Sequence, residues 1–342
     1  MIVRSRAPLR LGLAGGGTDV APYCDLFGGQ VMNVAINRFA YATLDESPTG
    51  VVEFHARDAA ASGECAAEAV SLQPGPLLLM QGVYLRICNG FLGGRRPALR
   101  IRTHSDAPPG SGLGSSSTMV VALVCAFNEY FGLALGDYEI AHLAYEVERI
   151  DLGLSGGKQD QYAAAFGGFN FIEFYADDRV IVNPLRVKDW VWAELEASLV
   201  LYFTGVSRSS AAIIDEQARN IAQGNEHALA ATHRLKLEAL QMKEAVLRGD
   251  PRRLAEVMQA GWVAKKHIAS SVNNPMIDAL EQVAFENGAT AAKVSGAGGG
   301  GFMMFMCDPA ERIRLVHALA AQGGTLWDTR FTSHGASAWR IG

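Results

Sequence analysis

The sequence lacks the features by which membrane proteins and nucleic-acid binders are usually recognised. Its longest apolar stretch, residues 119–127, is far shorter than the roughly 20 residues that cross a bilayer. It has 30 Lys and Arg against 35 Asp and Glu, a net charge of −5, and no lysine- or arginine-rich block. Because a nucleic-acid binder usually carries a basic surface, we expect neither nucleic acid nor membrane as a partner.

The cysteines and histidines also lack the spacings that are typical of disulfide-bonded or metal-binding proteins. Its five cysteines stand apart at positions 24, 65, 88, 125 and 307, without a CxxC pair, and the histidines show no HxH or HExxH spacing. This favours buried free thiols over disulfides, a zinc site or an iron site. The segment MIVRSRAPLRLGLAGGG has no long apolar region followed by a cleavage site. We therefore expect no signal peptide and a cytoplasmic protein.

The common nucleotide-binding signatures are missing as well. No lysine is followed by Ser or Thr, which excludes G-x-x-x-x-G-K-[ST], and the protein-kinase triplets HRD and DFG do not occur. Gly296, Gly298 and Gly301 fit G-x-G-x-x-G, but the strand-like FMMFMC follows them where that fingerprint requires a helix. The pattern therefore does not predict a Rossmann domain.

What the sequence does contain is a mixture of strand and helix patterns. In the first half, the predicted strands are 31–44 and 98–103, with a hairpin of 169–175 and 180–182 around a turn at 176–179. The helices predicted there are 116–131, apolar on most faces and so buried, and 137–150, with Ile150 on its apolar side. These patterns indicate an α+β chain.

From about residue 190 helices dominate, with predicted strands at 198–203 and 302–307. Asp250, Asn274 and Asp308 each precede a proline, which predicts three helix N-caps, and Glu311 gives the last of them capping-box spacing. Gly249 and Gly288 stand where helices should end. We therefore predict two domains, 1–190 and 191–342.

Glycine, at 37 residues, is concentrated in three clusters, LAGGGTD (13–19), PPGSGLGSSS (108–117) and KVSGAGGGG (293–301). One such cluster could be a tight turn, but three beside Ser, Thr, Asp or Lys favour phosphate binding. In the middle cluster, alternate glycines allow successive N–H groups to converge on an anion, and the serines then open a buried helix. This predicts a triphosphate site, with a serine hydroxyl available to Mg²⁺.

The three clusters, in this order, resemble the three signature motifs of the GHMP kinases, a family that includes galactokinase, homoserine kinase and mevalonate kinase. The segment from APLR to TD resembles the first motif, PPGSGLGSSS the second and KVSGAGGGGFMM the third. The resemblance covers the whole chain. It implies an ATP-binding ribosomal S5-like domain at 1–190, a ferredoxin-like domain at 191–342, and an active site between them.

The resemblance also implies roles for individual residues. Asp160 matches the active-site aspartate that accepts or orients the acceptor proton, and Arg10 matches the basic residue that assists it. Ser116 and Glu148 match the Mg²⁺ ligands, although a one-residue difference in the following loop leaves Glu146 as an alternative. The residues expected to bind ATP are Pro109, Gly110, Ser111, Gly112, Leu113, Gly114, Ser115, Ser116 and Ser117. ATP and Mg²⁺ are the implied cofactors.

Asp19, Gly16 and Gly17 of the first motif, and Gly298 and Gly299 of the third, are expected to contact the sugar. The first motif lacks the Glu-His of galactokinase, which argues against galactose itself. An acceptor that already carries a phosphate would need a further cation. The candidates for that cation are Lys158, Arg208 and Lys293.

Two stretches, RAPLRLGLAGGGTDVAPYCDLFGGQVMN and ERIDLGLSGGKQDQYAAAFGGFNFIEF, resemble the branch of the family that phosphorylates D-glycero-D-manno-heptose 7-phosphate. The implied reaction gives the 1,7-bisphosphate, for nucleotide-activated heptose and surface polysaccharide. Two alternatives remain: an anomeric kinase of an unphosphorylated sugar such as L-fucose or a uronic acid, and a non-catalytic sensor of sugar or nucleotide. The expected partners are a sugar phosphate and ATP, and the expected state is a monomer or homodimer.

Overall fold

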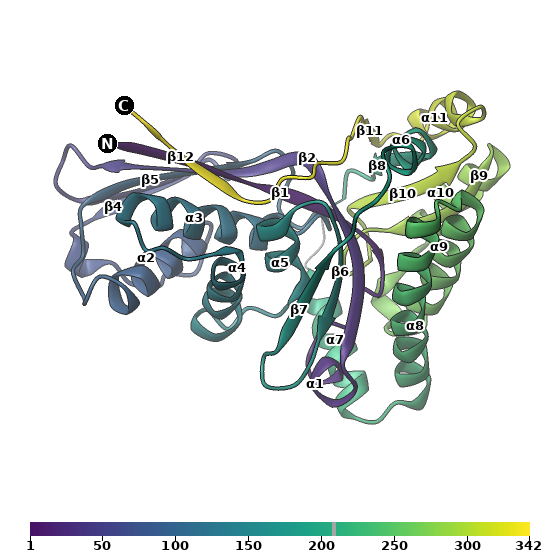
Figure 1. Cartoon of the computed structure of the whole chain (residues 1–342), viewed down its shortest axis with the longest axis horizontal. Helices are drawn as coiled ribbons and strands as arrows, with labels where there is room; N and C mark the ends of the chain where they lie inside the picture. Colours follow the sequence, from purple (N-terminus) through teal and green to yellow (C-terminus); the bar gives the residue numbers. More distant parts are fainter. Residues whose placement is uncertain (207–209) are drawn as a thin grey trace.

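The computed structural model describes residues 1–206 and 210–342, which form an α+β fold around two β-sheets (Figure 1). The first sheet contains β1 (Ile2–Ala14), β2 (Gly29–Glu46), β3 (Val52–Ala56), β4 (Ala61–Cys65), β5 (Leu99–Ser105), β6 (Phe169–Phe174), β7 (Val180–Pro184) and β12 (Ser337–Ile341). The second contains β8 (Leu199–Phe203), β9 (Ala289–Val294), β10 (Phe302–Cys307) and β11 (Thr325–Trp327).

The long strand β2 organises the first sheet. It pairs with β1 along most of its length, while on its other edge it pairs first with β6, over 29–34, and then with β5, over 40–46. The hairpin of β6 and β7 lies where the sequence predicts it. The β1–β2 ladder has register shifts between Pro8 and Arg10 and between Gly12 and Ala14, which is where irregularities of this kind bend a strand.

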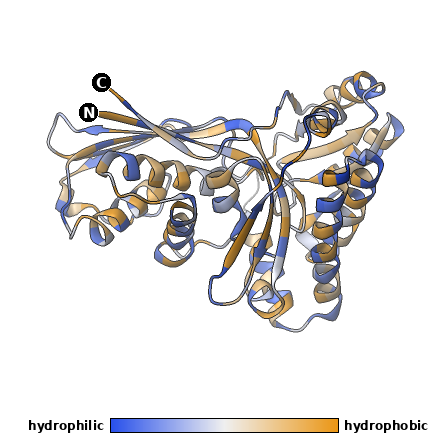
Figure 2. Cartoon of the chain, viewed as in Figure 1, coloured by the Kyte–Doolittle hydropathy of each residue, from blue (hydrophilic) through white to orange (hydrophobic). Residues whose placement is uncertain are grey.

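Helices α2 (Leu78–Gly90), α3 (Ser115–Phe131), α4 (Asp137–Glu146) and α5 (Gln159–Phe166) cover one face of the first sheet (Figure 1). Two short segments, α1 (Tyr23–Phe27) and η1 (Ala67–Ala69), also occur in this half of the chain. Every residue of α3 from Ser117 to Phe127 is buried, as its all-round apolar sequence predicts. Figure 2 shows hydrophobic residues concentrated on the strands and the inward sides of the helices.

The predicted helix 137–150 is wrong in its second half. The α-helical part ends at Glu146, and the chain continues as a π-helical turn, η2 (Val147–Asp151). A π turn changes the phase of the side chains, and turns of this kind often occur at functional sites. As a result Ile150, predicted to be buried, is 61% exposed, while Glu148 is buried.

In the second half, helices α8 (Glu226–Arg248) and α9 (Pro251–Lys265) pack side by side, and the remaining helical segments are α6 (Asp189–Ser198), α7 (Ser210–Ala222), η3 (Ser270–Val272), α10 (Pro275–Glu286) and α11 (Arg312–Ala320). All six residues of β10 are buried, which explains the uninterrupted apolar run there. One apolar cluster joins β1 and β2 to α8, α9 and β10, so the two sheets share part of their core.

Most of the predicted helix ends are confirmed. The Asp250 carboxylate accepts a hydrogen bond from the backbone N–H of Arg253 at 3.0 Å, and the Asn274 side chain caps α10 in the same way. The prediction at Asp308 is wrong, because α11 begins only at Arg312. Asp308 instead closes a separate turn before that helix, accepting from the N–H of Ala310.

The last strand returns to the beginning of the chain. β12 pairs antiparallel with β1, from Ile2 opposite Ile341 to Arg6 opposite Ser337, so both ends of the chain lie together (Figure 1). In the proposed division into 1–190 and 191–342, this strand therefore belongs with the first domain. Within the described residues, none of the helices is long and apolar enough to span a membrane.

Candidate active site

A cavity of about 320 Å³ lies where the three glycine-rich segments meet. The first segment contributes Gly16, Gly17 and Asp19, the second contributes residues of 110–117, and the third contributes Gly296 and Ala297. The remaining walls come from the start of α5, the π turn with the loop after it, and one face each of α7 and α9. Both halves of the chain therefore build the same site.

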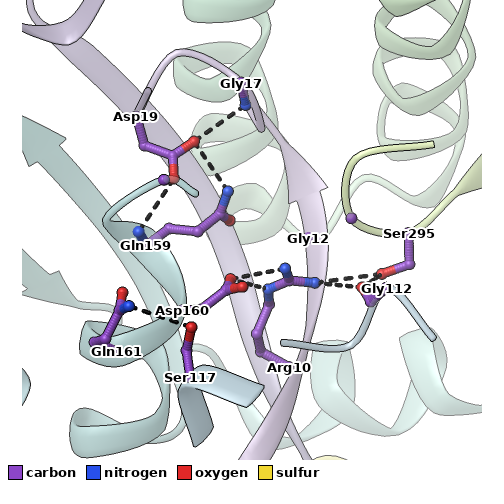
Figure 3. A network of polar contacts seen from close by, with 12 residues as sticks. Arg10, Gly12, Gly17, Asp19, Gly112, Ser117, Gln159, Asp160, Gln161 and Ser295 are labelled. Carbon is purple, nitrogen blue, oxygen red and sulfur yellow. Dashed lines mark hydrogen bonds and ion pairs between the residues drawn. The ribbon is translucent and has the colours of Figure 1, made fainter. Parts of the chain in front are cut away.

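Arg10 and Asp160 form an ion pair in this cavity (Figure 3). The Arg10 Nε and Nη2 atoms both lie 2.7 Å from Asp160 Oδ1. Arg10 Nη1 donates to the carbonyl of Gly112 at 2.7 Å and also reaches the Ser295 hydroxyl at 3.5 Å. A buried arginine on β1 thus holds the first turn of α5 against the second and third glycine loops.

The loop 108–117 has the geometry of an anion nest. Gly110, Gly112 and Gly114 have φ values of 70°, 85° and 77°, a left-handed conformation that glycine adopts without strain. Gly114 is the N-cap of α3 and supplies no side chain, so the first N–H groups of that helix remain available to a ligand. Together the loop and the helix end provide convergent donors and a favourable dipole for phosphate.

The predicted ATP-binding residues divide into two groups. The six that line the cavity are Gly110, Gly112, Gly114, Ser115, Ser116 and Ser117. Ser111 and Leu113 are fully buried, and their carbonyls accept from the backbone of Phe302 and Arg10. Pro109 also lies outside the cavity lining. The side chains at these three positions therefore do not line the cavity.

The third glycine cluster serves mainly to bring two loops together. A Cβ atom on Gly296 would lie only 2.7 Å from the Cα of Gly112, and one on Gly112 would overlap the Ser295 carbonyl. Gly298 and Gly299, which the sequence predicts as sugar contacts, do not line the cavity. They pack against η3, where the Gly299 N–H donates to the Val272 carbonyl at 2.7 Å.

Asp19 is held rigidly at the edge of the cavity (Figure 3). Its Oδ1 accepts from the Gly17 N–H and the Gln159 side chain, and its Oδ2 accepts from the Gln159 N–H, each at 3.1 Å. A Cβ atom on Gly157 would overlap this carboxylate, which explains the glycine there. The remaining acceptor capacity of Oδ2 is available for a ligand hydroxyl.

The structure separates the two glutamates that the sequence left as alternatives. Glu146 forms an ion pair with Arg86 outside the cavity. Glu148 lines the cavity, where its Oε2 accepts from Gln161 Nε2 at 2.5 Å and Arg149 lies 3.7 Å from its Oε1. Burial raises the pKa of Glu148, against the opposing effects of Arg149, Ser117 and Gln161.

These surroundings fit a divalent cation. A nearby cation would stabilise the buried Glu148 carboxylate, and Ser116 and Ser117 add hydroxyl oxygens on the same side of the cavity. Within residues 1–206 and 210–342, no cluster of three His, Cys, Asp or Glu residues could hold a metal by itself. The ion would therefore take most of its ligands from phosphate and water, as Mg²⁺ commonly does.

Two of the cations predicted to receive a second phosphate, Lys158 and Lys293, do not line the cavity. Lys158 donates to Asp178 at 2.7 Å, with Asp25 3.6 Å away. Lys293 donates to the carbonyls of Gly12 and Leu13. Both ammonium groups therefore already have partners within the protein. Arg208 lies outside the described residues.

Six polar side chains line the cavity without having been predicted, namely Arg149, Ser155, Gln159, Ser210, Gln217 and Lys265. Lys265 is 3% exposed, and its Nζ donates to the Gly296 carbonyl. The pKa of Lys265 is lowered to about 8, chiefly by burial; Asp19 and Asp160 act to raise it and Arg10 acts to lower it. The sequence did carry a signal, because Lys265 continues a helical stripe of buried residues through Leu254, Met258 and Trp262.

The arrangement combines a phosphate-binding loop, a cation-compatible carboxylate and an aspartate fixed by an arginine. Such a set of groups can position a nucleotide phosphate and accept a proton from an attacking hydroxyl. Loops and helices from both halves of the chain line this cavity, so a bound ligand would contact both halves.

Comparison with known proteins places these features in context. Residues 79–168 match the family of GHMP kinases N terminal domains, and residues 242–325 match GHMP kinases C terminal. The chain is 45% identical over 340 residues to D-glycero-alpha-D-manno-heptose 7-phosphate kinase of Campylobacter jejuni, covering 99% of each chain. It is 27% identical to L-fucokinase/L-fucose-1-P guanylyltransferase of Bacteroides fragilis, covering 92% of this chain and 35% of that one.

Among solved structures, the chain resembles the crystal structure of a D-glycero-D-manno-heptose 1-phosphate kinase from Bacteroides thetaiotaomicron. The TM-score is 0.85 and the sequences are 44% identical, with 99% of both chains covered. The similarity therefore extends over the complete fold and includes both halves of the cavity.

Proposed function

Because this chain belongs to the GHMP kinase family, we propose that it transfers the γ-phosphate of ATP to the anomeric hydroxyl of D-glycero-D-manno-heptose 7-phosphate. Membership makes it a kinase that phosphorylates an alcohol oxygen. The proposed product is the heptose 1,7-bisphosphate, made in the cytoplasm as a precursor of nucleotide-activated heptose and surface polysaccharide.

The observation that carries the proposal is the Arg10–Asp160 ion pair facing a cavity between the two halves of the chain. In the proposed reaction, the oxygen of the acceptor hydroxyl forms a bond to the γ-phosphorus while Asp160 accepts the proton of that hydroxyl. The bond between the γ-phosphorus and the bridging oxygen of ATP breaks, and ADP leaves. Arg10 holds the carboxylate in place through Oδ1, which leaves Oδ2 for the acceptor.

The loop 108–117 and the start of α3 are proposed to bind the ATP phosphates through backbone N–H groups. Glu148, with Ser116 or Ser117, would hold Mg²⁺, which when bound supplies positive charge to the phosphate oxygens. Arg149 contributes a further cation beside them. These groups provide the charge neutralisation that phosphoryl transfer requires.

The names of the relatives support a heptose phosphate as acceptor and differ in one respect. One is named a heptose 7-phosphate kinase and the other a heptose 1-phosphate kinase. In both names the acceptor already carries a phosphate, and the two names differ in the position of that phosphate. Phosphorylation of heptose 1-phosphate is therefore the second candidate function.

The test is ADP release with Mg²⁺-ATP and a panel of acceptors, namely D-glycero-D-manno-heptose 7-phosphate, the corresponding 1-phosphate, unphosphorylated heptose and L-fucose. We expect turnover with the 7-phosphate and a new phosphate on the anomeric carbon, detected by phosphorus–proton NMR correlation. Turnover with the 1-phosphate alone would replace the proposal by its second candidate. Turnover confined to an unphosphorylated sugar would overturn both.

The Asp160→Asn variant should lose nearly all turnover, while Asp58→Asn, a change at an exposed turn aspartate, should retain it. ATP binding without ADP release from the wild type, with every acceptor in the panel, would favour a non-catalytic sensor.

A further inference from the structure

Two polar groups in the cavity have no task in phosphoryl transfer. Lys265, at the end of α9, is 3% exposed, and Gln217, on α7, is 5% exposed. Within the described residues, Gln217 Nε2 has no hydrogen-bond partner. In the same part of the chain, no carboxylate lies within 4.0 Å of Lys265 Nζ, whose one hydrogen bond goes to the Gly296 carbonyl. Both side chains therefore have unused donor capacity.

Both groups face the first glycine loop. A Cβ atom on Gly16 would lie 3.7 Å from Lys265 Nζ, and one on Gly17 would lie 3.4 Å from Gln217 Oε1. Since these two residues have no side chains, the space between the loop and the two helices remains open to a ligand. Ser210, at the start of α7, lines the same cavity and adds a hydroxyl.

The chemistry of these groups selects an anion. A buried ammonium without an ion pair is costly, and it gains most from a ligand that brings negative charge together with acceptor oxygens. A sugar hydroxyl could satisfy the Gln217 amide but would leave the Lys265 charge unpaired. A phosphate offers charge to the lysine and a further oxygen to the amide.

We propose that Lys265 and Gln217 bind the phosphate group that the acceptor sugar already carries. This inference rests on the proposed function, because it assumes that the acceptor is a sugar phosphate. Of the cations that the sequence suggested for this role, Lys158 and Lys293 have other partners, and Arg208 lies outside the described residues. The pair of Lys265 and Gln217 makes the acceptor phosphate a requirement for tight binding, and so determines which sugars the enzyme accepts.

The proposal predicts a particular pH dependence. Only protonated Lys265 can pair with the phosphate, and its pKa in the free protein is lowered to about 8 by burial, with Asp19, Arg10 and Asp160 as the other charges that act on it. Lys293 of β9 lies close enough for its own pKa to be lowered by Lys265, and Glu238 of α8 faces α9 at Gly261. The KM for the acceptor should therefore rise above about pH 8, approaching tenfold per pH unit.

The experiment compares KM and kcat for heptose 7-phosphate and unphosphorylated heptose in the wild type, Lys265→Met and Lys265→Arg. We expect Lys265→Met to raise the KM for the phosphorylated acceptor about 10- to 100-fold, the usual value of one charge-assisted hydrogen bond. The KM for ATP and kcat/KM for the unphosphorylated sugar should not change. Lys265→Arg should restore much of the affinity and remove the rise of KM above pH 8.

Lys266→Met is the matched control, because its ammonium pairs with Asp278 and Glu281 outside the cavity. Gln217→Glu is a second variant of nearly unchanged shape. By placing a negative charge beside the phosphate, it should weaken the phosphorylated acceptor selectively. Thermal unfolding of each variant establishes that the protein is folded before kinetics are compared.

Two results would overturn the proposal. One is that Lys265→Met lowers kcat equally with heptose 7-phosphate and with unphosphorylated heptose. That result would mean that the lysine acts on the phosphoryl group being transferred and not on the phosphate of the acceptor. The other is unchanged selectivity for the phosphorylated acceptor in both Lys265→Met and Gln217→Glu. If the wild type itself does not prefer the phosphorylated acceptor, the proposed function fails together with this inference, and the wild-type data alone reveal it.

Discussion

The two sides of the cavity are prepared for a ligand in different ways. On the transfer side, formed by Arg10, Asp160, Glu148 and the loop 108–117, every charged group already contacts a partner within the protein. On the acceptor side, formed by Gln217 and Lys265, an amide donor has no partner and the ammonium has no ion pair among the described residues. Charges that stabilise a transition state must be held in place before the reaction, as on the transfer side. A buried donor without a partner instead favours those ligands that can supply the missing acceptor, as on the acceptor side.

The strongest test of this difference concerns whether the transfer side acts as a unit. We expect Asp160→Asn and Arg10→Met each to lower kcat by about 10²- to 10⁴-fold, the usual contribution of a general base. Because Arg10 acts by holding Asp160, the double variant should be little worse than the poorer single one. Steady-state kinetics with saturating substrates measures this. Fully multiplicative losses would show that the two residues act independently.

The acceptor side can be tested without any ligand, through stability. The pKa of Lys265 is lowered to about 8 by burial, whereas in the unfolded chain it is about 10.4. Between these values the unfolded chain binds more protons, so this group makes the free energy of unfolding rise with pH from about 8 to 10. Denaturant titrations of Lys265→Met across this range should lack a rise of about 3 kcal/mol that the wild type shows.

Lys266→Met is the control for that measurement, because ion pairing with Glu281 and Asp278 raises the pKa of Lys266. It should keep the rise between pH 8 and 10. A Lys265→Met protein with the same pH profile as the wild type would mean that Lys265 is solvated normally, and the contrast between the two sides would disappear.

A third experiment examines the metal on the transfer side. Removing a residue that only supports a metal ligand typically weakens the affinity for the metal about 10- to 100-fold. Loss of a direct ligand should therefore weaken the affinity for Mg²⁺ by at least this factor. Glu148→Gln should therefore require correspondingly more Mg²⁺ for half-maximal activity. Glu146→Gln, whose carboxylate pairs with Arg86, should not. Equal effects of the two changes would remove Glu148 from the proposed site.

The smallest effect concerns the contact between the second and third glycine loops. Gly296→Ala places a methyl group against the backbone of Gly112, while Gly323→Ala has the same left-handed conformation with open space around it. Both variants should be destabilised by the left-handed backbone conformation, but only Gly296→Ala should also be destabilised by overpacking. We therefore expect Gly296→Ala to be less stable than Gly323→Ala by about 1–2 kcal/mol. Urea unfolding measures the difference. Equal losses would mean that the loops can separate.

Much of this molecule could be predicted where a local pattern was sufficient. The buried helix α3, the hairpin of β6 and β7 and the caps at Asp250 and Asn274 depend on neighbours in sequence, and all are confirmed. The π turn at 147–151 could not be predicted, because the apolar spacing through Val147 and Ile150 also fits a continuous α-helix. Nor could the return of β12 to β1, a pairing across the length of the chain.

The same division applies to the site. The sequence by itself indicated the family and the phosphate-binding loop, because phosphate binding requires glycines and serines at fixed spacing along one loop. The roles of Arg10, Asp160 and Glu148 followed only from the resemblance, which left Glu146 as an alternative to Glu148.

Only the tertiary structure decided which glycines pack against backbone and which line the cavity, and that Lys158 and Lys293 have partners elsewhere. It also decided that Lys265 and Gln217 line one cavity beside Gly16 and Gly17. Buried charge in a cavity depends on what surrounds it in space, and residues from α7, α9 and β1 become neighbours only when the chain is folded.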